Sequence, residues 1–366
     1  MTAIADRIRV WEDPAADEVG SCVEEFLQRL EGPTWLQIPG RDRSRSRAFV
    51  TLLHGNEPSG TRALHAWLRS GARPAVDLVA FVGTVQTALT LPHFSHRTLP
   101  ARRDLNRCFQ PPFLGREGQL ASELLQRLRE LQPEALIDLH NTSGAGPAYG
   151  VTARLDAKHE ALTAFFARRL IHTRLRLGAL VEATEQDCPT VTIECGGVGE
   201  TRSDEIALEG LTRYAAADPL FEEDARPLMS VLRDPIRVEL RKGARIAYGP
   251  EPVADVDLTL CADLERHNFG ILKTGELLGW LGPAGVDALV ARDADGRERT
   301  SELFEAHEGC LRVARPLEPL MVTTDLRVAM SDCLFYVVFP EAGVRMTDSE
   351  PVLSDIEDRS DMGGAA

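Results

Sequence analysis

The chain has 366 residues, 43% of them hydrophobic and 27% charged, which is enough apolar material for one large domain or two ordinary ones. Its formal net charge of −15 disfavours binding to nucleic acid and to anionic membranes. A local cationic pocket for an anionic substrate remains compatible with that charge.

The cysteines and the N-terminus argue against a secreted or membrane protein. Seven scattered cysteines without a C-x-x-C pair do not suggest a disulfide framework or a cysteine zinc site. The N-terminal sequence MTAIADRIRVWED lacks the apolar core of a signal peptide. The longest apolar run, Cys333 to Phe339, is shorter than the ~18–20 residues that a membrane helix needs. We therefore expect a cytoplasmic protein.

Strands alternate with amphipathic helices over the first part of the chain. Hydrophobic spacing predicts, in chain order, a helix over 17–31, strands over 34–39 and 48–54, a helix over 61–70, a strand over 76–85, a helix over 117–131, a strand over 134–140, a helix over 157–171, a strand over 189–197 and a helix over 203–217. This alternation is typical of an α/β domain whose mainly parallel or mixed sheet is flanked by helices.

The connector 40–47 contains four arginines. They could mark an anion-binding site, but the polar composition favours a solvated hairpin loop between the strands on either side.

From residue 228 onward the pattern becomes β-rich. Period-two alternation, with glycine and proline between the runs, occurs in 235–249, 256–265, 275–282 and 333–340. We therefore expect a catalytic α/β domain over 1–227 and a smaller β-rich domain over 228–346. The segment 347–366 is acidic, contains few large apolar residues and is expected to be disordered.

The sequence HGNE at 54–57 ends the strand 48–54. An imidazole and a carboxylate three residues apart, as in His54 and Glu57, can face one zinc ion. The carboxyl end of a strand is also where open α/β sheets place their active sites. Gly55 and Gly60 are expected to let the backbone bend sharply there. By itself the pair also fits a surface loop.

A second histidine, His140, ends the strand 134–140. Together with His54 and Glu57 it would complete a two-histidine, one-glutamate set that leaves a fourth position for water, as catalytic zinc requires. Asp138 lies on the same face of the strand and could fix the imidazole of His140 or pair with an arginine. Alone, His140 also fits a core or loop histidine.

Glu194 lies in the apolar strand 189–197, where an unpaired carboxylate is costly. Beside zinc it could act as the general base that takes a proton from water and delivers it to the leaving amine. The alternative is a structural salt bridge. Cys195 is expected to be a small core residue rather than a nucleophile.

The tetrapeptide 104–107, DLNR, offers a site for an anion. Arg107 presents a planar fork suited to a carboxylate, and Asn106 adds a directional hydrogen bond. The two side chains would anchor an anionic substrate next to the zinc. A polar turn without function is the alternative.

Four stretches, HGNEPSG, DLNRCF, DLHNTSG and TIECGG, resemble the motifs of the succinylglutamate desuccinylase/aspartoacylase family of the zinc carboxypeptidase clan, in the family's order. The resemblance covers roughly residues 48–200. The segment NFGILKTGELLGWLG also resembles the family's C-terminal β domain.

This resemblance implies a zinc carboxypeptidase-like fold with one Zn²⁺ per chain. The residues that it assigns are the zinc ligands His54, Glu57 and His140, the general base Glu194, and Asn106 with Arg107 as binders of a substrate carboxylate.

The family also has an arginine shortly before D-L-N-R that polarises the scissile carbonyl. Arg97 lies seven residues before this motif, farther than in the family, whereas Arg102 and Arg103 lie closer than the family pattern. We take Arg97 as the candidate. Thr84 stands where the family tends to have asparagine, which leaves the acyl-group preference open.

These features predict a zinc-dependent amidohydrolase, a deacylase that cleaves the linear amide bond of an N-acyl amino acid or a similar small carboxylate-bearing amide. Its expected partner is a small-molecule substrate, with no nucleic acid and no membrane, and a homo-oligomer is allowed. The alternatives are a metallocarboxypeptidase acting on peptide C-termini and an inactive zinc-binding module.

Overall fold

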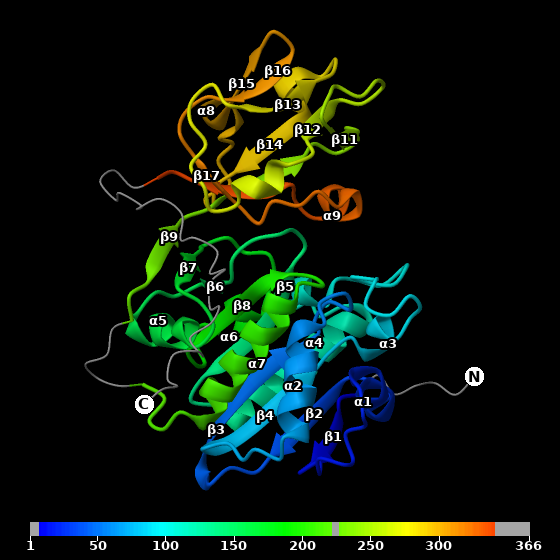
Figure 1. Ribbon diagram of the computed structural model, residues 1–366, viewed down its shortest axis with the longest axis vertical. Helices are drawn as coiled ribbons and strands as arrows, with labels where there is room; N and C mark the ends of the chain where they lie inside the picture. The colour runs from blue at the N-terminus through cyan, green and yellow to red at the C-terminus, as the bar shows by residue number, and fades with distance from the viewer. Residues whose placement is uncertain (1–6, 222–226, 341–366) are drawn as a thin grey trace, which may run out of the picture.

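The computed structural model describes residues 7–221 and 227–340, so the acidic tail expected at 347–366 lies outside the described residues. Figure 1 shows two parts: an α/β part that contains the N-terminal two thirds of the chain, and a β-rich part stacked on one end of it.

A nine-stranded mixed sheet forms the centre of the α/β part, in the order β1-β2-β4-β3-β5-β8-β6-β7-β9. Its strands are β1 (Arg9–Glu12), β2 (Thr34–Ile38), β3 (Asp42–Thr51), β4 (Val76–Val82), β5 (Leu136–Thr142), β6 (Tyr149–Thr152), β7 (Arg169–His172), β8 (Thr190–Gly197) and β9 (Ser230–Arg233). The neighbours β4, β3, β5 and β8 run parallel, so their carboxyl ends meet at one edge. β9 extends this sheet just beyond the boundary expected at 227.

Helices cover both faces of this sheet. The helices are α1 (Val23–Leu30), α2 (Ser59–Arg69), α3 (Val85–Ala88), α4 (Gly115–Leu131), α5 (Ala157–Ala164), α6 (Leu180–Thr184) and α7 (Thr201–Ala216), with a 3₁₀ turn η1 at Leu105–Arg107. One apolar core joins α1, α2, α5 and α7 to the sheet, and a second joins α4 and α6 to its other face. The expected α/β architecture is therefore confirmed.

The sequence misplaced the ends of two helices. Helix α1 begins only at Val23, after Gly20, whose φ of +83° is left-handed. The helix expected over 157–171 ends at Ala164, because Arg169–His172 pairs with β6 as strand β7. Tertiary pairing thus overrides the helical spacing of that segment.

The hairpin expected around 40–47 is also absent from the described residues, since β2 and β3 both pair with β4 rather than with each other. Residues 42–47 belong to strand β3 itself. Three of the arginines pair with acids: Arg43 with Asp77, Arg45 with Asp42 and Asp218, and buried Arg47 with Glu134. These ion pairs account for the arginines without a bound anion.

The β-rich part contains two further sheets around a separate apolar core. The four-stranded sheet has the order β14-β10-β18-β17, and the five-stranded sheet has the order β11-β12-β13-β16-β15. Their strands are β10 (Ile236–Leu240), β11 (Ile246–Gly249), β12 (Leu258–Cys261), β13 (Leu277–Leu281), β14 (Leu289–Arg292), β15 (Phe304–His307), β16 (Cys310–Val313), β17 (Glu318–Leu320) and β18 (Phe335–Val338). The short helical elements are η2 (Leu264–His267), η3 (Gly285–Ala288), α8 (Thr300–Leu303) and α9 (Leu326–Ser331).

Side chains from both parts pack and bond together at their junction. Tyr149 of β6 and Ile171 of β7 share an apolar cluster with Leu320 and Tyr336. In addition, Asn268 Nδ2 donates to the carbonyl of Ala145 at 2.7 Å, in the loop that follows β5. The β-rich part therefore holds a loop at the edge where the parallel strands end.

No helix in the part of the chain that the structure describes is both long and apolar enough to cross a bilayer.

Gly60, in α2, allows the helix to approach β3 and β5 closely and does not form a bend. Its φ is not positive, and a Cβ there would lie 2.2 Å from Thr51 Oγ1 and 3.0 Å from Leu139 Cδ2. We expect Gly60→Ala to destabilise the protein by about 1–3 kcal/mol, because the buried contact with β3 and β5 must open. Chemical denaturation measures this, with Ala66→Ser on the exposed face of α2 as the control, expected within about 0.5 kcal/mol of wild type. Equal midpoints for Gly60→Ala and wild type would refute the close-contact role.

Candidate active site

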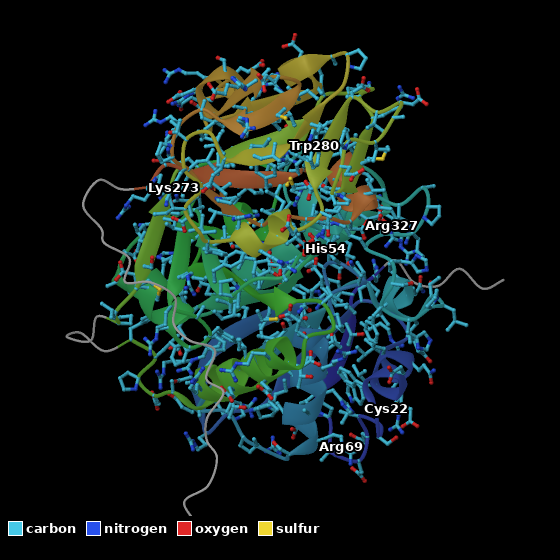
Figure 2. The ribbon with its side chains drawn as sticks, turned by 45° about the horizontal axis from the view of Figure 1, so that its top comes forward. Cys22, His54, Arg69, Lys273, Trp280 and Arg327 are labelled. Atoms are coloured by element: carbon cyan, nitrogen blue, oxygen red, sulfur yellow. The ribbon has the colours of Figure 1, made fainter. Side chains whose placement is uncertain are left out.

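His54, Glu57 and His140 lie together at the carboxyl edge of the parallel strands, where β3 and β5 end. One ligand atom from each lies within 4.8 Å of the other two, and all three side chains are buried. Nδ1 of His54 is 2.8 Å from Glu57 Oε1, and Nδ1 of His140 is 2.6 Å from Glu57 Oε2. Figure 2 shows His54 near the middle of the molecule, below the part that carries Trp280.

The opposite nitrogens of the two imidazoles face other carboxylates. Nε2 of His54 is 2.9 Å from Asp104 Oδ1. Nε2 of His140 lies 3.0 Å from Asp138 Oδ2, in close contact but without the alignment of a hydrogen bond. Carboxylates behind metal-binding imidazoles fix the ring and leave the other nitrogen free for the ion. Asp138 therefore lies behind the imidazole of His140, where it could fix the ring, rather than beside an arginine.

The chain turns sharply just before this cluster. Leu52 is fully buried and adopts a left-handed φ of +58°, which is rare and costly for a side chain of its size. Its carbonyl accepts hydrogen bonds from the backbone N–H and the hydroxyl of Thr84 at 2.7 and 2.8 Å. The expected sharp bend is therefore at Leu52, whereas Gly55 leaves room for Thr87 and the carbonyl of His96.

Glu194 of β8 is the register neighbour of His140 on β5. Its Oε2 is buried and has no hydrogen-bond partner among the described residues. The pKa of the Glu194 carboxyl is raised to about 7, chiefly by burial and in part by the charge of Glu57, although the nearby His140 acts in the opposite direction. A buried carboxyl with a free oxygen and a pKa near neutrality is suited to accepting and returning a proton.

Cys195 is fully buried beside Glu194, and its Sγ donates to the carbonyl of His140 at 3.1 Å. Burial raises the pKa of this thiol, so it remains protonated. Cys195 is therefore a core residue, as the sequence predicted.

Of the three candidate arginines, the structure brings only Arg97 to the cluster of His54, Glu57 and His140. Its guanidinium lies 3.4 Å from Glu57 Oε1 and 3.0 Å from Asp104 Oδ2. Arg102 pairs with Glu117 instead, and Arg103 donates to the carbonyl of Leu114. Arg97 thus has the position of a group that could contact a carbonyl at the metal.

Asn106 and Arg107 lie in η1, held next to the cluster. The backbone N–H of Asn106 donates to Asp104 Oδ1 at 2.8 Å, while its own Oδ1 accepts from the backbone N–H of Leu180 at 2.9 Å. Arg107 Nη2 lies 2.9 Å from Asp332 Oδ2 of the β-rich part. The arginine expected to bind a substrate carboxylate therefore already contacts a carboxylate of the chain itself.

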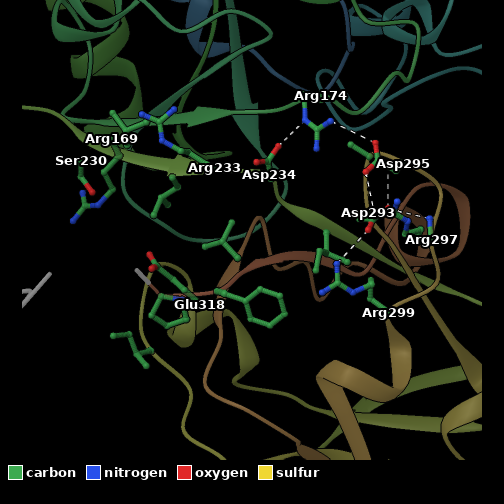
Figure 3. A pocket seen from close by; sticks show the side chains of 18 of the residues that line it. Arg169, Arg174, Ser230, Arg233, Asp234, Asp293, Asp295, Arg297, Arg299 and Glu318 are labelled. Carbon is green, nitrogen blue, oxygen red and sulfur yellow. Dashed lines mark hydrogen bonds and ion pairs between the residues drawn. The ribbon is translucent and has the colours of Figure 1, made fainter. Parts of the chain in front are cut away.

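A cavity of about 120 Å³ adjoins the cluster and is lined by Asn106, Arg107 and Glu194 together with Leu320, Met321 and Tyr336 of the β-rich part. A larger cavity of about 640 Å³ lies beside the edge strand β9, away from the cluster (Figure 3). Several of its arginines pair with acids, Arg174 with Asp234 and Arg299 with Asp293. The smaller cavity is the one adjacent to the candidate chemistry.

Three residues at the site were not predicted from the sequence: Asp104, Asp332 and Tyr336. Asp104 belongs to the D-L-N-R motif, and its position before Asn106 was a usable signal. Asp332 and Tyr336 are distant in sequence from every motif, and no local pattern marks them. Only the packing of the β-rich part against the α/β part brings them to the site.

Comparison with solved structures shows the fold. A succinylglutamate desuccinylase/aspartoacylase from Rhodobacter sphaeroides superposes with a TM-score of 0.51 at 16% identity, covering 84% of this chain and 88% of the other. Murine aminoacylase 3 gives a TM-score of 0.52 at 19% identity, with 82% and 96% covered. Succinylglutamate desuccinylase from Vibrio parahaemolyticus gives 0.52 at 15% identity, with 83% and 85% covered.

The comparison with curated proteins gave no match. The family model for the succinylglutamate desuccinylase/aspartoacylase catalytic domain matches residues 48–216, which contain all the predicted site residues. The two activities named for that family, desuccinylase and aspartoacylase, hydrolyse amide bonds. Residues 48–216 of this chain therefore match the catalytic domain of the succinylglutamate desuccinylase/aspartoacylase family.

Proposed function

We propose that this protein is a zinc-dependent deacylase that hydrolyses the amide bond of an N-acyl amino acid or a similar small amide carrying a carboxylate. The observation that carries the proposal is the convergence of His54, Glu57 and His140, whose ligand atoms lie within 4.8 Å of one another. The free oxygen of Glu194 on the neighbouring strand supports it.

The donor set fits a zinc ion. Two imidazoles and one carboxylate are the protein ligands of many catalytic zinc sites, which keep one position open. Each imidazole turns one nitrogen toward Glu57 and the other toward Asp104 or Asp138. Zinc held there would supply a Lewis acid for the amide carbonyl and lower the pKa of water toward ~7.

The other steps of the proposed reaction are carried out by side chains of the protein. Glu194 accepts the proton of the attacking water and then delivers it to the nitrogen of the leaving amine. Arg97 donates to the carbonyl oxygen as negative charge develops on it. Arg107, with N–H groups beyond those it uses on Asp332 and Asn106, holds a substrate carboxylate and thereby positions the amide.

The size of the cavity favours small amides over peptide C-termini. Leu320, Met321 and Tyr336 of the β-rich part line the space next to Glu194, so this part narrows access to the site. A cavity of about 120 Å³ holds a group of a few heavy atoms and leaves no room for an extended peptide.

The proposal is tested by zinc analysis and turnover on one preparation. Protein reconstituted with zinc should contain one equivalent per chain and hydrolyse N-acyl amino acids faster than short peptides. Faster release of C-terminal residues from peptides would favour a metallocarboxypeptidase. Bound zinc without hydrolysis of any panel member would favour an inactive binding module.

Arg97→Lys is expected to lower kcat by about 10²–10³-fold, since an ammonium cannot reproduce the guanidinium's contacts with both a carbonyl and Asp104. The matched control is Arg102→Lys, five residues along the same loop, whose partner is Glu117. Steady-state kinetics measures kcat for both variants and shows which arginine contacts the carbonyl. Impairment of Arg102→Lys alone would transfer the role to Arg102.

A further inference from the structure

The carboxylate of Asp332 lies between three arginines, one of which, Arg107, lines the 120 Å³ cavity. Its Oδ2 lies 2.9 Å from Arg107 Nη2 and 3.5 Å from Arg97 Nη2. Its Oδ1 and its carbonyl oxygen both accept from Arg237 Nη2, at 2.6 and 2.9 Å. Asp332 follows helix α9 and precedes β18, so the β-rich part supplies this negative charge to the active site of the α/β part.

Arg237 holds Asp332 firmly in this position. Arg237 lies on β10, which pairs directly with β18, and it bonds both the side chain and the backbone of Asp332. The Asp332 side chain is 17% exposed, so water screens these contacts weakly. Asp332 is therefore held firmly beside Arg107, which lines the cavity, and a substrate carboxylate cannot simply replace it.

The charges near the cavity are consequently balanced before a substrate binds. Arg97 already contacts Asp104, Glu57 and Asp332, and Arg107 contacts Asp332. The remaining N–H groups of Arg107 can hold one carboxylate. Among residues 7–221 and 227–340, no further cation lines the 120 Å³ cavity to balance a second carboxylate.

Aliphatic side chains make up much of the rest of this cavity, and the polar residues among them, Thr173, Glu182, Thr192 and Tyr336, carry no positive charge. Its lining includes the aliphatic side chains of Val151, Ile171, Leu175, Leu177, Val181, Leu320 and Met321. A carboxylate placed against such a wall loses its hydration and gains no partner, which is strongly unfavourable. A cavity of about 120 Å³ is slightly smaller than the ~150 Å³ that accommodates a benzene molecule, so it suits a small aliphatic group.

We propose that Asp332 is a specificity-determining residue that makes this site select N-acyl amino acids with an apolar side chain over those with a second carboxylate. This inference rests on the proposed function, because it assigns the substrate class of the same site. Asp332 acts by neutralising Arg107 and Arg97, while the aliphatic wall takes the side chain of the substrate.

The test compares two ligands of nearly equal shape, N-acetyl-L-leucine and N-acetyl-L-aspartate. Calorimetric titration of the metal-free protein measures their binding without turnover, and kinetics of the zinc-loaded protein measures their kcat/KM. Wild type should bind and hydrolyse the leucine derivative on the order of 10²-fold better. Equal or tighter binding of the aspartate derivative, or binding of neither at millimolar concentration, would overturn the inference.

Asp332→Asn keeps the shape of the side chain and removes its charge. The preference for the leucine derivative should then fall on the order of tenfold or more, mainly through tighter binding of the aspartate derivative. The control is Asp293→Asn, which removes a carboxylate of similar exposure, 15%, that pairs with Arg299 far from the cluster. An unchanged preference in Asp332→Asn, at normal thermal stability, would contradict the proposed role.

If Asp332→Asn proves unstable, the comparison of the two ligands on the wild-type protein still tests the substrate preference. The two readouts also separate this inference from the proposed function. Selective binding of the leucine derivative without hydrolysis of either compound would refute the deacylase and leave the assigned pocket intact. Hydrolysis with the opposite preference would support the deacylase and refute the role of Asp332.

Discussion

Glu194→Gln is expected to lower kcat for amide hydrolysis by about 10²–10⁴-fold while the protein still binds zinc. Glutamine keeps the size and the hydrogen-bonding reach of the side chain, but it cannot accept a proton from the attacking water. Because Glu194 belongs to β8 and is not one of the three clustered residues His54, Glu57 and His140, the candidate metal ligands should remain in place.

Kinetics and zinc analysis of the same preparation measure this effect. Glu318→Gln is the matched control, because Glu318 is another buried glutamate whose pKa is raised by burial, yet it lines the cavity beside β9. Its kcat should equal that of wild type. Wild-type kcat in Glu194→Gln would exclude Glu194 as the general base, and loss of zinc would instead make it a ligand.

His140→Ala is expected to abolish both zinc binding and hydrolysis. Removing this imidazole leaves two ligands, and it also leaves Asp138 fully buried without its imidazole contact. Asp138→Asn should have a smaller effect, a loss of about 10–100-fold in zinc affinity, since Asp138 acts through the ring of His140.

Competition with a fluorescent zinc chelator measures these affinities. His159→Ala is the control, because His159 is also buried but lies on α5 and pairs with Asp156. It should bind zinc like wild type. Full activity in His140→Ala, or in wild type after exhaustive chelation, would disprove the metal site.

Much of the fold could be predicted because hydrophobic spacing is a local property. The strands over 76–82 and 136–142 appear where apolar runs predicted them. The errors arose where pairing partners decide the outcome. Residues 169–172 form β7 because β6 lies beside them, and residues 42–47 extend β3 along β4 instead of closing a hairpin. No window of sequence contains those partners.

The meeting of His54, Glu57 and His140 could be predicted for a related reason. His54 follows β3 and His140 lies near the end of β5, and these strands run parallel, so their ends meet at one edge of the sheet and bring two distant motifs together. The choice of Arg97 over Arg102 and Arg103 could not be derived from spacing, because all three lie in one irregular loop. The contacts of Arg97 with Asp104 and Glu57 distinguish it.

The sequence by itself determined the class of fold and pointed to the candidate ligand residues, because strand periodicity and the four motifs are properties of neighbouring residues. Only the tertiary structure decided which groups surround the candidate site. Asp332 and Tyr336 lie about 190 residues beyond His140 and reach the site through the docking of one apolar core against another. Such packing depends on the contact surfaces of both parts of the protein, so no pattern of neighbouring residues in the sequence predicts it.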